Sequence, residues 1–179
     1  MVKELEVKIL NIDLDEMEKK IISLGGSLIA KEVQVNTLID STNKPIKESI
    51  NAYLRLRETK DLLNNKSDTT LTLKKIISTD GLRENIEMNS EVENKEVVLQ
   101  IFRELGYDLI EVGHKERKSY KLHNARFDLD IWDEETYPYP YMEIEVESQE
   151  ELDKMIKLLD ISKENISTKS IMELKEELN

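Results

Sequence analysis

The chain has 179 residues, of which 36% are charged, and a formal net charge of −12 at pH 7. A chain this acidic repels nucleic acids and anionic membranes, so we expect neither as its main partner. It contains no cysteine, which excludes disulfides, thiolate nucleophiles and cysteine-ligated zinc. The sequence shows neither a signal-peptide hydrophobic run nor a stretch long enough to span a bilayer, and we expect a cytoplasmic protein.

Alternation with period two predicts strands in the first half of the chain, and apolar spacing near 3.6 predicts a helix. In chain order the pattern predicts a strand at residues 2–10, a helix at 13–24, and strands at 28–40, 52–58, 69–75 and 83–88. Asp13 and Glu16 form a capping box at the helix start, and Gly25-Gly26 ends the helix. Pro45 marks a turn, and the polar residues 60–68 are expected to form a long, mobile hairpin loop.

The second half repeats the order of the first. It predicts a helix from about Asn94 to Gly106, a hairpin of residues 110–122 and 125–131, a strand at 141–147, a helix capped by Ser148 and Glu151, and a last helix at about 168–178. The helix after Asn94 is expected to bury Val97, Val98, Ile101, Phe102 and Leu105. Residues 24–40 (LGGSLIAKEVQVNTLID) also resemble residues 105–122 (LGYDLIEVGHKERKSYKL). Two similar halves predict an α+β protein with a closed, pseudo-symmetric antiparallel β-barrel, in a single domain of residues 1–179.

The polar face of nearly every predicted strand is charged, since residues two apart point to the same side of a strand. These positions are Glu4, Glu6, Lys8, Arg55, Arg57, Thr72, Lys74, Arg83, Asn85, Glu87, Lys115, Arg117, Asp128, Asp130, Glu143, Glu145 and Glu147. One interpretation is that they form the solvated faces of ordinary half-buried strands. Exposed strand faces usually include Thr, Ser and Gln, however, and like charges side by side cost energy unless an opposite charge lies between them.

The other interpretation is the interior of a tunnel, which would use both signs of charge. Arginine and lysine side chains would surround phosphate oxygens, with each guanidinium fork binding two of them. Carboxylates would supply hard oxygen ligands for Mg²⁺ or Mn²⁺. No Ser–His–acid or Cys–His arrangement can be drawn from the sequence, so the chemistry would depend on electrostatic stabilisation and a metal ion.

Short motifs in a fixed order carry a family resemblance. Glu4-Leu-Glu6-Val-Lys8 matches the ExExK signature of the CYTH, or triphosphate tunnel metalloenzyme, superfamily. It is followed by LRLR at 54–57, LTLKK at 71–75, Glu87, RxxY at 117–120, LDIW at 129–132, EIE at 143–145 and KSIMEL at 169–174, which resembles the family's closing helix. The superfamily includes class IV adenylate cyclases, thiamine triphosphatases, inorganic tripolyphosphatases and RNA triphosphatases.

The resemblance implies a closed eight-stranded antiparallel β-barrel, the triphosphate tunnel, with helices packed outside it. It implies phosphate-binding roles for Lys8, Arg55, Arg57, Lys74, Arg117 and Lys169. It implies metal-binding roles for Glu4, Glu6, Glu87, Asp130, Glu143 and Glu145. Glu4, Glu6 and Lys8 are the predicted catalytic residues, and the predicted cofactor is Mg²⁺ or Mn²⁺. Arg83, Lys115, Asp128 and Glu147 share the charged face and are expected near the tunnel mouths.

The expected function is metal-dependent hydrolysis of a triphosphate-containing small molecule, either inorganic tripolyphosphate or an organic triphosphate. A class IV adenylate cyclase, which converts ATP to cyclic AMP and pyrophosphate, is the alternative. A non-catalytic polyphosphate- or nucleotide-binding module is a second alternative, and a homodimer is left open. Hydrolysis is favoured because the sequence contains no recognisable set of base-binding residues. In addition, Pro138 and Pro140 stand where many cyclase-like members have a glycine-rich turn.

Overall fold

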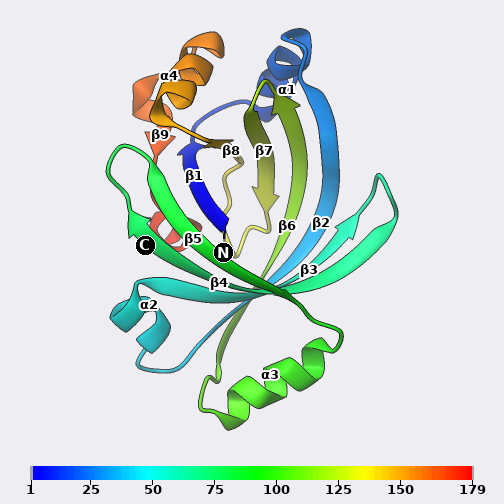
Figure 1. Ribbon diagram of the computed structural model, residues 1–179, viewed down its shortest axis with the longest axis vertical. Helices are drawn as coiled ribbons and strands as arrows, with labels where there is room; N and C mark the ends of the chain where they lie inside the picture. Colours follow the sequence, from blue (N-terminus) through cyan, green and yellow to red (C-terminus); the bar gives the residue numbers. More distant parts are fainter. Residues whose placement is uncertain (1, 179) are drawn as a thin grey trace.

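The computed structural model describes residues 2–178 and shows eight antiparallel strands closed into a barrel (Figure 1). The strands are β1 (Val2–Ile9), β2 (Ser27–Asp40), β3 (Ala52–Asp61), β4 (Lys66–Ser78), β5 (Arg83–Glu91), β6 (Leu109–Leu122), β7 (Ala125–Trp132) and β8 (Tyr141–Val146). They pair in the order β5-β4-β3-β2-β6-β7-β8-β1, and pairing of β1 with β5 closes the ring. The predicted α+β barrel is therefore confirmed, and its two similar strands, β2 and β6, pair with each other.

Helices lie outside the barrel. They are α1 (Leu14–Ser23), α2 (Pro45–Ile50), α3 (Lys95–Glu104), α4 (Gln149–Leu158) and α5 (Ile171–Glu176), with a 3-10 turn at Lys163–Asn165. The predicted N-caps are present, since Asp13 accepts a hydrogen bond from the Glu16 amide and Ser148 from the Glu151 amide. At Asp13 only one of the two bonds of the predicted capping box is found among the described residues. No helix within residues 2–178 is long and apolar enough to cross a membrane.

The hydrophobic core lies between the barrel wall and the helices, not inside the barrel. One cluster joins the outer faces of β1, β7 and β8 to α1 and α4, and includes Ile9, Phe127 and Ile144. A second joins β3 and β4 to α3, and includes Leu54 and Leu56. Because the apolar residues of each strand point outward to these helices, the alternating charged residues point into the barrel. This excludes the interpretation that the charged faces are ordinary solvated surfaces.

Helix α3 buries less of its apolar surface than the sequence predicted. Val97, Ile101 and Leu105 are 52%, 51% and 67% exposed, whereas Val98 and Phe102 pack on the second cluster. Two adjacent apolar ridges run along this helix. The convex outer wall of the barrel contacts one ridge and leaves the other in solvent.

Three other segments also differ from the prediction. Residues 60–68 are not a long loop, because β3 and β4 extend as a paired ladder to a four-residue turn at 62–65. Backbone pairing continues there although the side chains are polar, since this end of the hairpin has solvent on both faces. Pro45 opens helix α2 and not only a turn, and the Asp40 carboxylate accepts hydrogen bonds from amides at its start.

The last helix is shorter than predicted. Ile166–Ser167 forms a two-residue strand, β9, that pairs with the second half of β1. Helix α5 begins only after Ser170, which forms a capping box with Glu173. The chain therefore reaches one end of the barrel before α5 starts, and side chains of α5 line the cavity from there.

Candidate active site

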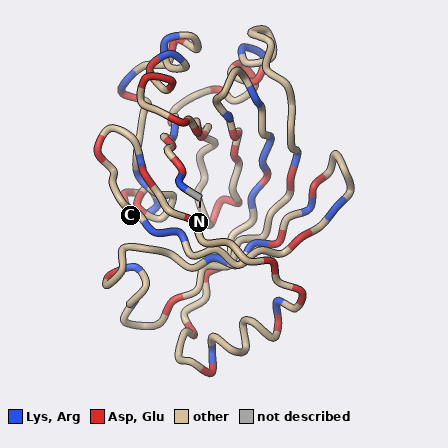
Figure 2. Tube along the Cα trace, in the orientation of Figure 1, with Lys and Arg blue, Asp and Glu red and all other residues tan. Residues whose placement is uncertain are grey.

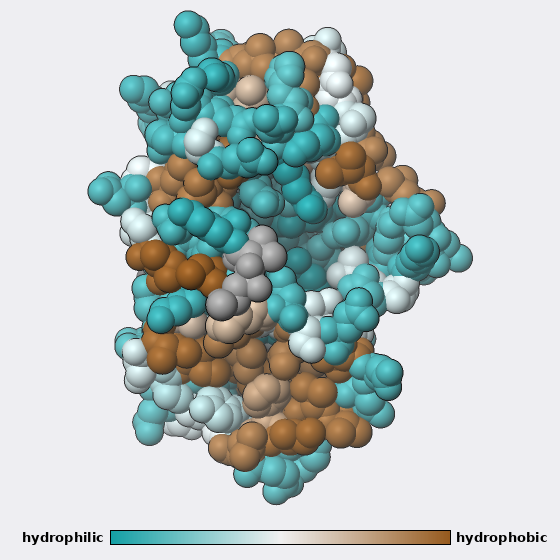
Figure 3. Space-filling model, viewed as in Figure 1, coloured by the Kyte–Doolittle hydropathy of each residue, from teal (hydrophilic) through white to brown (hydrophobic). Residues whose placement is uncertain are grey.

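The barrel encloses a cavity of about 410 Å³. Figure 2 shows charged residues alternating with uncharged ones along the strands, and Figure 3 shows a hydrophilic hollow at the centre of the face in view. Ten of the predicted site residues line the cavity, namely Glu4, Glu6, Lys8, Arg55, Arg57, Lys74, Glu87, Arg117, Glu143 and Glu145. Residues that are distant in sequence meet there because strand pairing sets their side chains opposite each other.

Lys74 is surrounded by three carboxylates. Its Nζ lies 2.7 Å from Glu4 Oε2, 3.2 Å from Glu87 Oε1 and 3.3 Å from Glu6 Oε1. Burial is the largest single influence on the Lys74 pKa and lowers it, but the charges around the amine together hold the pKa well above its usual value. Lys74 is therefore a fixed, fully compensated cation.

Arg117 is held by three carboxylates in the same way. It donates to Asp130 at 2.6 and 2.5 Å, to Glu143 at 2.7 Å, and lies 2.5 Å from Asp128. These carboxylates hold the Arg117 pKa well above its usual value despite burial, which lowers it. Most of the guanidinium hydrogen-bonding capacity is already used.

The structure places Asp130, a predicted metal ligand, away from the cavity. It is completely buried beneath the cavity wall, and its oxygens accept hydrogen bonds from Arg117 and, at 3.0 Å, from Lys115. It is not among the residues that line the cavity. Asp130 lies opposite Arg117 in the β6–β7 ladder, and this register makes it the partner of a cation and removes it from the cavity.

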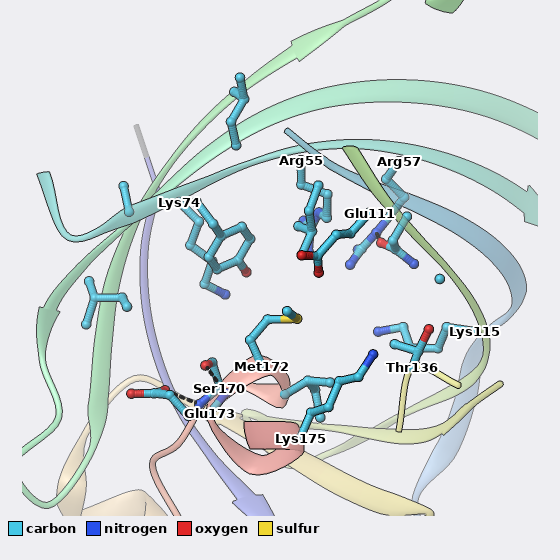
Figure 4. Close-up of a pocket in the computed structure, with 18 of the residues that line it drawn as sticks. Arg55, Arg57, Lys74, Glu111, Lys115, Thr136, Ser170, Met172, Glu173 and Lys175 are labelled. Carbon is cyan, nitrogen blue, oxygen red and sulfur yellow. Dashed lines mark hydrogen bonds between the residues drawn. The ribbon is translucent and has the colours of Figure 1, made fainter. Parts of the chain in front are cut away.

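Lys169 is not brought to the cavity either. Its side chain is exposed and pairs with Glu177. The lysine of α5 that lines the cavity is Lys175, in the last turn of the helix. Figure 4 shows Lys175 projecting from α5 into the cavity. The sequence motif marked the right helix but not the side chain that faces inward.

Arg55, Arg57 and Lys115 form a positive group that carboxylates do not fully compensate, and Figure 4 shows all three pointing into one space. Arg57 donates to Asn36 at 2.7 Å, and no carboxylate among residues 2–178 lies within ion-pair distance of it. Burial, followed by repulsion from Arg55 and Arg117, lowers the Arg57 pKa to about 9. Burial, followed by repulsion from Arg117, lowers the Lys115 pKa to about 7. The buried Nε of Arg55 lacks a hydrogen-bond partner in the described chain. This group would gain most from a bound anion.

Glu4, Glu6 and Glu145 form the opposite, negative group. Glu6 and Glu145 are direct cross-strand neighbours in the β1–β8 ladder, an arrangement that places like charges side by side. Burial, followed by repulsion from Glu4, raises the pKa of Glu145. Burial also raises the pKa of Glu4, although Lys74 acts against it. Glu145 makes no hydrogen bond or ion pair with any residue in the described range.

The negative group fits a divalent cation that is shared with a ligand. No three carboxylates or imidazoles among residues 2–178 converge as a preformed metal site. Mg²⁺ in proteins is usually bound by one or two carboxylates, several waters and substrate phosphates, and does not need a complete protein cage. Glu145 is half-buried and makes no ion pair among the described residues, and together with its neighbours Glu4 and Glu6 it offers oxygen donors for such an ion.

Other residues of the site were placed less well by the sequence. Arg83, Lys115 and Asp128 line the cavity and are not simply at its mouths, whereas Glu147 is exposed and does not line it. Tyr53 also lines the cavity and was not predicted. It lies two residues before Arg55 on β3 and opposite Lys74 on β4, so strand parity was the signal that would have found it.

Comparison with known proteins agrees with this geometry. The family model for the CYTH domain matches residues 2–173. A Methanocaldococcus jannaschii protein named "putative adenylate cyclase" is 28% identical, covering 96% of this chain and 98% of its own. A solved structure from Pyrococcus horikoshii is 26% identical, with a TM-score of 0.76 over 96% of this chain and 98% of that one. A Hippeastrum "putative adenylyl cyclase" with a dominant triphosphatase activity is 14% identical and shares the fold, with a TM-score of 0.62 over 95% and 91% of the two chains.

Proposed function

Because this chain belongs to the CYTH domain family, we propose that it hydrolyses a triphosphate held inside the barrel, with Mg²⁺ or Mn²⁺ as cofactor. The observation that carries the proposal is the separation of charge within one cavity. Arg55, Arg57 and Lys115 lack full compensation by carboxylates, and Glu4 and Glu145 lack full compensation by cations. A triphosphate and a divalent ion bound together would supply both missing charges.

The positive group would bind and orient the phosphate chain. Arginine forks match pairs of phosphate oxygens, and the half-buried side chains of Arg55 and Arg57 project into the cavity before binding. Preorganised donors of this kind stabilise charge that develops during phosphoryl transfer. Lys74 and Arg117, already ion-paired, would hold the carboxylates in place and contribute long-range positive potential.

Glu4, Glu6 and Glu145 would hold the divalent ion. When bound, the ion would neutralise phosphate charge and favour an attacking water. The side chains around it would keep the phosphate chain in line for attack at the terminal phosphorus, with release of orthophosphate. No side-chain nucleophile is needed, and both histidines are exposed.

A class IV adenylate cyclase is the second candidate, supported by the Methanocaldococcus jannaschii relative that covers almost the whole chain. In that reaction the ribose 3′-oxygen of ATP attacks the α-phosphorus and pyrophosphate leaves.

The decisive experiment incubates the protein with Mg²⁺ or Mn²⁺ and tripolyphosphate, thiamine triphosphate, ATP or GTP, and identifies the products. Orthophosphate supports hydrolysis, cyclic AMP with pyrophosphate supports the cyclase, and no product from any of the four contradicts both.

Activity is expected to require a divalent cation and to survive loss of both histidines. Excess EDTA should abolish turnover, and Mg²⁺ or Mn²⁺ should restore it, because Glu4, Glu6 and Glu145 supply oxygen ligands but no alternative positive charge. The variant His114→Ala/His123→Ala should retain wild-type turnover, measured as product released per minute. Full activity in EDTA would contradict the metal-binding assignment, and an inactive double variant would contradict the absence of a histidine mechanism.

The pH dependence of kcat/KM should reflect the ionisation of Lys115. Its pKa of about 7 means that the free protein loses this positive charge as the pH rises through neutrality. We therefore expect kcat/KM, which reports ionisations of the free enzyme, to fall above about pH 7. Lys115→Arg should remove this fall because a guanidinium stays charged, while any part due to ionisation of the substrate itself should remain. The Lys115 assignment is wrong if the wild-type and Lys115→Arg profiles have the same shape.

A further inference from the structure

Two inward residues of β5, Arg83 and Asn85, lie next to the carboxylate of Glu6. Asn85 is completely buried and does not line the cavity, whereas Arg83 is 2% exposed and reaches the cavity. In the ladder of β1 and β5, Arg83 lies directly opposite Glu6, and Asn85 lies opposite Glu4. A residue that contacts Glu6 but does not reach the cavity can act on a bound ligand only through Glu6.

Three donors converge on one oxygen of Glu6. Asn85 Nδ2 donates to Glu6 Oε1 at 2.9 Å, Lys74 Nζ lies 3.3 Å from the same oxygen, and Arg83 Nε lies 3.9 Å from it. Oε2 accepts no hydrogen bond from residues 2–178. A carboxylate with one oxygen fixed by several donors keeps a single orientation, and its other oxygen remains available to a cation.

Arg83 also connects Glu6 to the start of α5. Its Nη1 donates to the Thr168 carbonyl at 2.8 Å and to Glu173 Oε2 at 3.3 Å. The same oxygen of Glu173 accepts a hydrogen bond from the Ser170 amide at 2.6 Å, within the capping box of the helix (Figure 4). The docked start of α5 therefore fixes the guanidinium of Arg83, which in turn lies against Glu6.

Both residues of β5 retain a buried polar atom without a partner. Asn85 Oδ1 and Arg83 Nη2 make no hydrogen bond within the described chain. A buried polar atom without a partner lowers the stability of the fold, and an apolar side chain of similar shape would avoid this loss. Stability alone therefore does not explain why these two side chains are polar. Buried polar groups that lower stability are typical of functional sites.

We propose that Asn85 and Arg83 are positioning residues for the divalent ion, which hold Glu6 Oε1 so that Oε2 binds the ion. This inference rests on the proposed function, in which Glu6 is one of the residues that hold the ion. Asn85 and Arg83 would not contact the ion themselves. Glu6 would contribute a single oxygen, because its other oxygen is already occupied by donors of the protein.

The test is a double-mutant cycle on the dissociation constant for Mn²⁺ alone, measured by electron paramagnetic resonance without a triphosphate. Asn85→Ala should weaken Mn²⁺ binding about 10- to 100-fold, the size expected when a residue that orients a metal ligand is lost. Glu6→Ala should weaken it at least as much. In the Glu6→Ala background, Asn85→Ala should cause no further loss, because Asn85 acts only through Glu6. Arg83→Lys keeps the charge but loses the guanidinium fork, and its effect should depend on Glu6 in the same way.

Asn36→Ala is the matched control. Asn36 is also a buried asparagine, 3% exposed, but it lies on β2 and accepts a hydrogen bond from Arg57. Asn36→Ala should leave the Mn²⁺ constant as in the wild type and weaken the binding of tripolyphosphate in metal-free buffer. Asn85→Ala should do the reverse. A merely structural residue would change both constants, and a thermal scan shows whether each variant is folded.

Positioning by Asn85 is overturned if Asn85→Ala leaves the Mn²⁺ constant unchanged, or if its effect is equally large in the Glu6→Ala background. If Asn85→Ala does not fold, the cycle of Arg83→Lys with Glu6→Ala decides. If Mn²⁺ alone does not bind the wild type, the same cycle uses the Mn²⁺ concentration that gives half-maximal turnover of tripolyphosphate. A wild type in which Mn²⁺ neither binds nor supports turnover would instead overturn the proposed function.

Discussion

Replacement of Arg57 by alanine is expected to weaken triphosphate binding about 10- to 150-fold, equivalent to roughly 1.5–3 kcal/mol for a hydrogen-bonding partner of a charged group. Arg57 is half-buried, burial and then repulsion from Arg55 lower its pKa to about 9, and the described chain offers it no carboxylate at ion-pair distance. Its charge is therefore available to a bound anion. The free protein should be as stable as the wild type or more so, since the variant relieves repulsion with Arg55 and Arg117. Calorimetric titration and a thermal scan measure the two effects.

Two other arginines provide the controls. Arg103 is exposed on α3 and lies outside the cavity, so Arg103→Ala should change neither affinity nor melting temperature. Arg117→Ala should lower stability by about 3–5 kcal/mol, because it leaves the buried carboxylates Asp128 and Asp130 without their main cation. Equal behaviour of Arg57→Ala and Arg103→Ala would mean that the positive group does not bind the substrate.

Glu145→Gln and Asp130→Asn are expected to have opposite effects. Among residues 2–178 Glu145 makes no ion pair, and burial followed by repulsion from Glu4 raises its pKa although Arg126 acts against it. Neutralising Glu145 should therefore leave the metal-free protein as stable or more stable. The same change should raise the metal concentration needed for half-maximal activity by about 10- to 100-fold. Asp130→Asn should instead lower stability by about 3–5 kcal/mol, because Arg117 and Lys115 lose the charge that they surround. Metal titration of activity and thermal scans of the metal-free variants compare the two.

Ligand-induced stabilisation gives an independent measure of the Glu145 assignment. Mg²⁺ and a triphosphate together should raise the melting temperature of the wild type beyond the sum of their separate effects, since a ligand at about 100 times its dissociation constant stabilises by roughly 2.7 kcal/mol. Glu145→Gln should lose most of this synergy. A clearly destabilised Glu145→Gln with intact synergy would show that Glu145 is a structural partner of Arg126 and not a metal ligand.

Much of the architecture was predictable from local sequence patterns. Alternation along the strands sorted apolar from charged side chains, and helix caps such as Asp13 and Ser148 located the helix starts to within a residue or two. Both signals depend on near neighbours in the chain, so they survive without tertiary information. The extent of the β3–β4 hairpin and the exposed ridge of α3 could not be predicted in this way, because they depend on strand pairing and on the curvature of the barrel wall.

Most residues of the candidate site could be predicted from the sequence, but which of their charges are compensated could not. Strand parity and motif order selected ten residues that line the cavity. Whether a charge is compensated depends on which residue lies opposite it, and the register of separate strands decides that. Asp130 lies opposite Arg117 and becomes a buried partner. Glu145 lies between Glu6 on β1 and Arg126 on β7, but Arg126 pairs with Asp128, so Glu145 keeps a largely uncompensated charge.

By itself, then, the sequence determined that acidic and basic side chains share the inner face of a barrel, since a two-residue period places them there whatever the packing. Only the tertiary structure decided which of them remain uncompensated and which lysine of α5 faces inward. It also decided that Leu38, Tyr53, Ile76 and Leu109 form one apolar end. These four residues lie on four strands that are distant in sequence, and each alone resembles an ordinary strand residue. They come together because β4, β3, β2 and β6 are consecutive neighbours in the sheet, and the register of these pairs places the four side chains at the same end of the barrel.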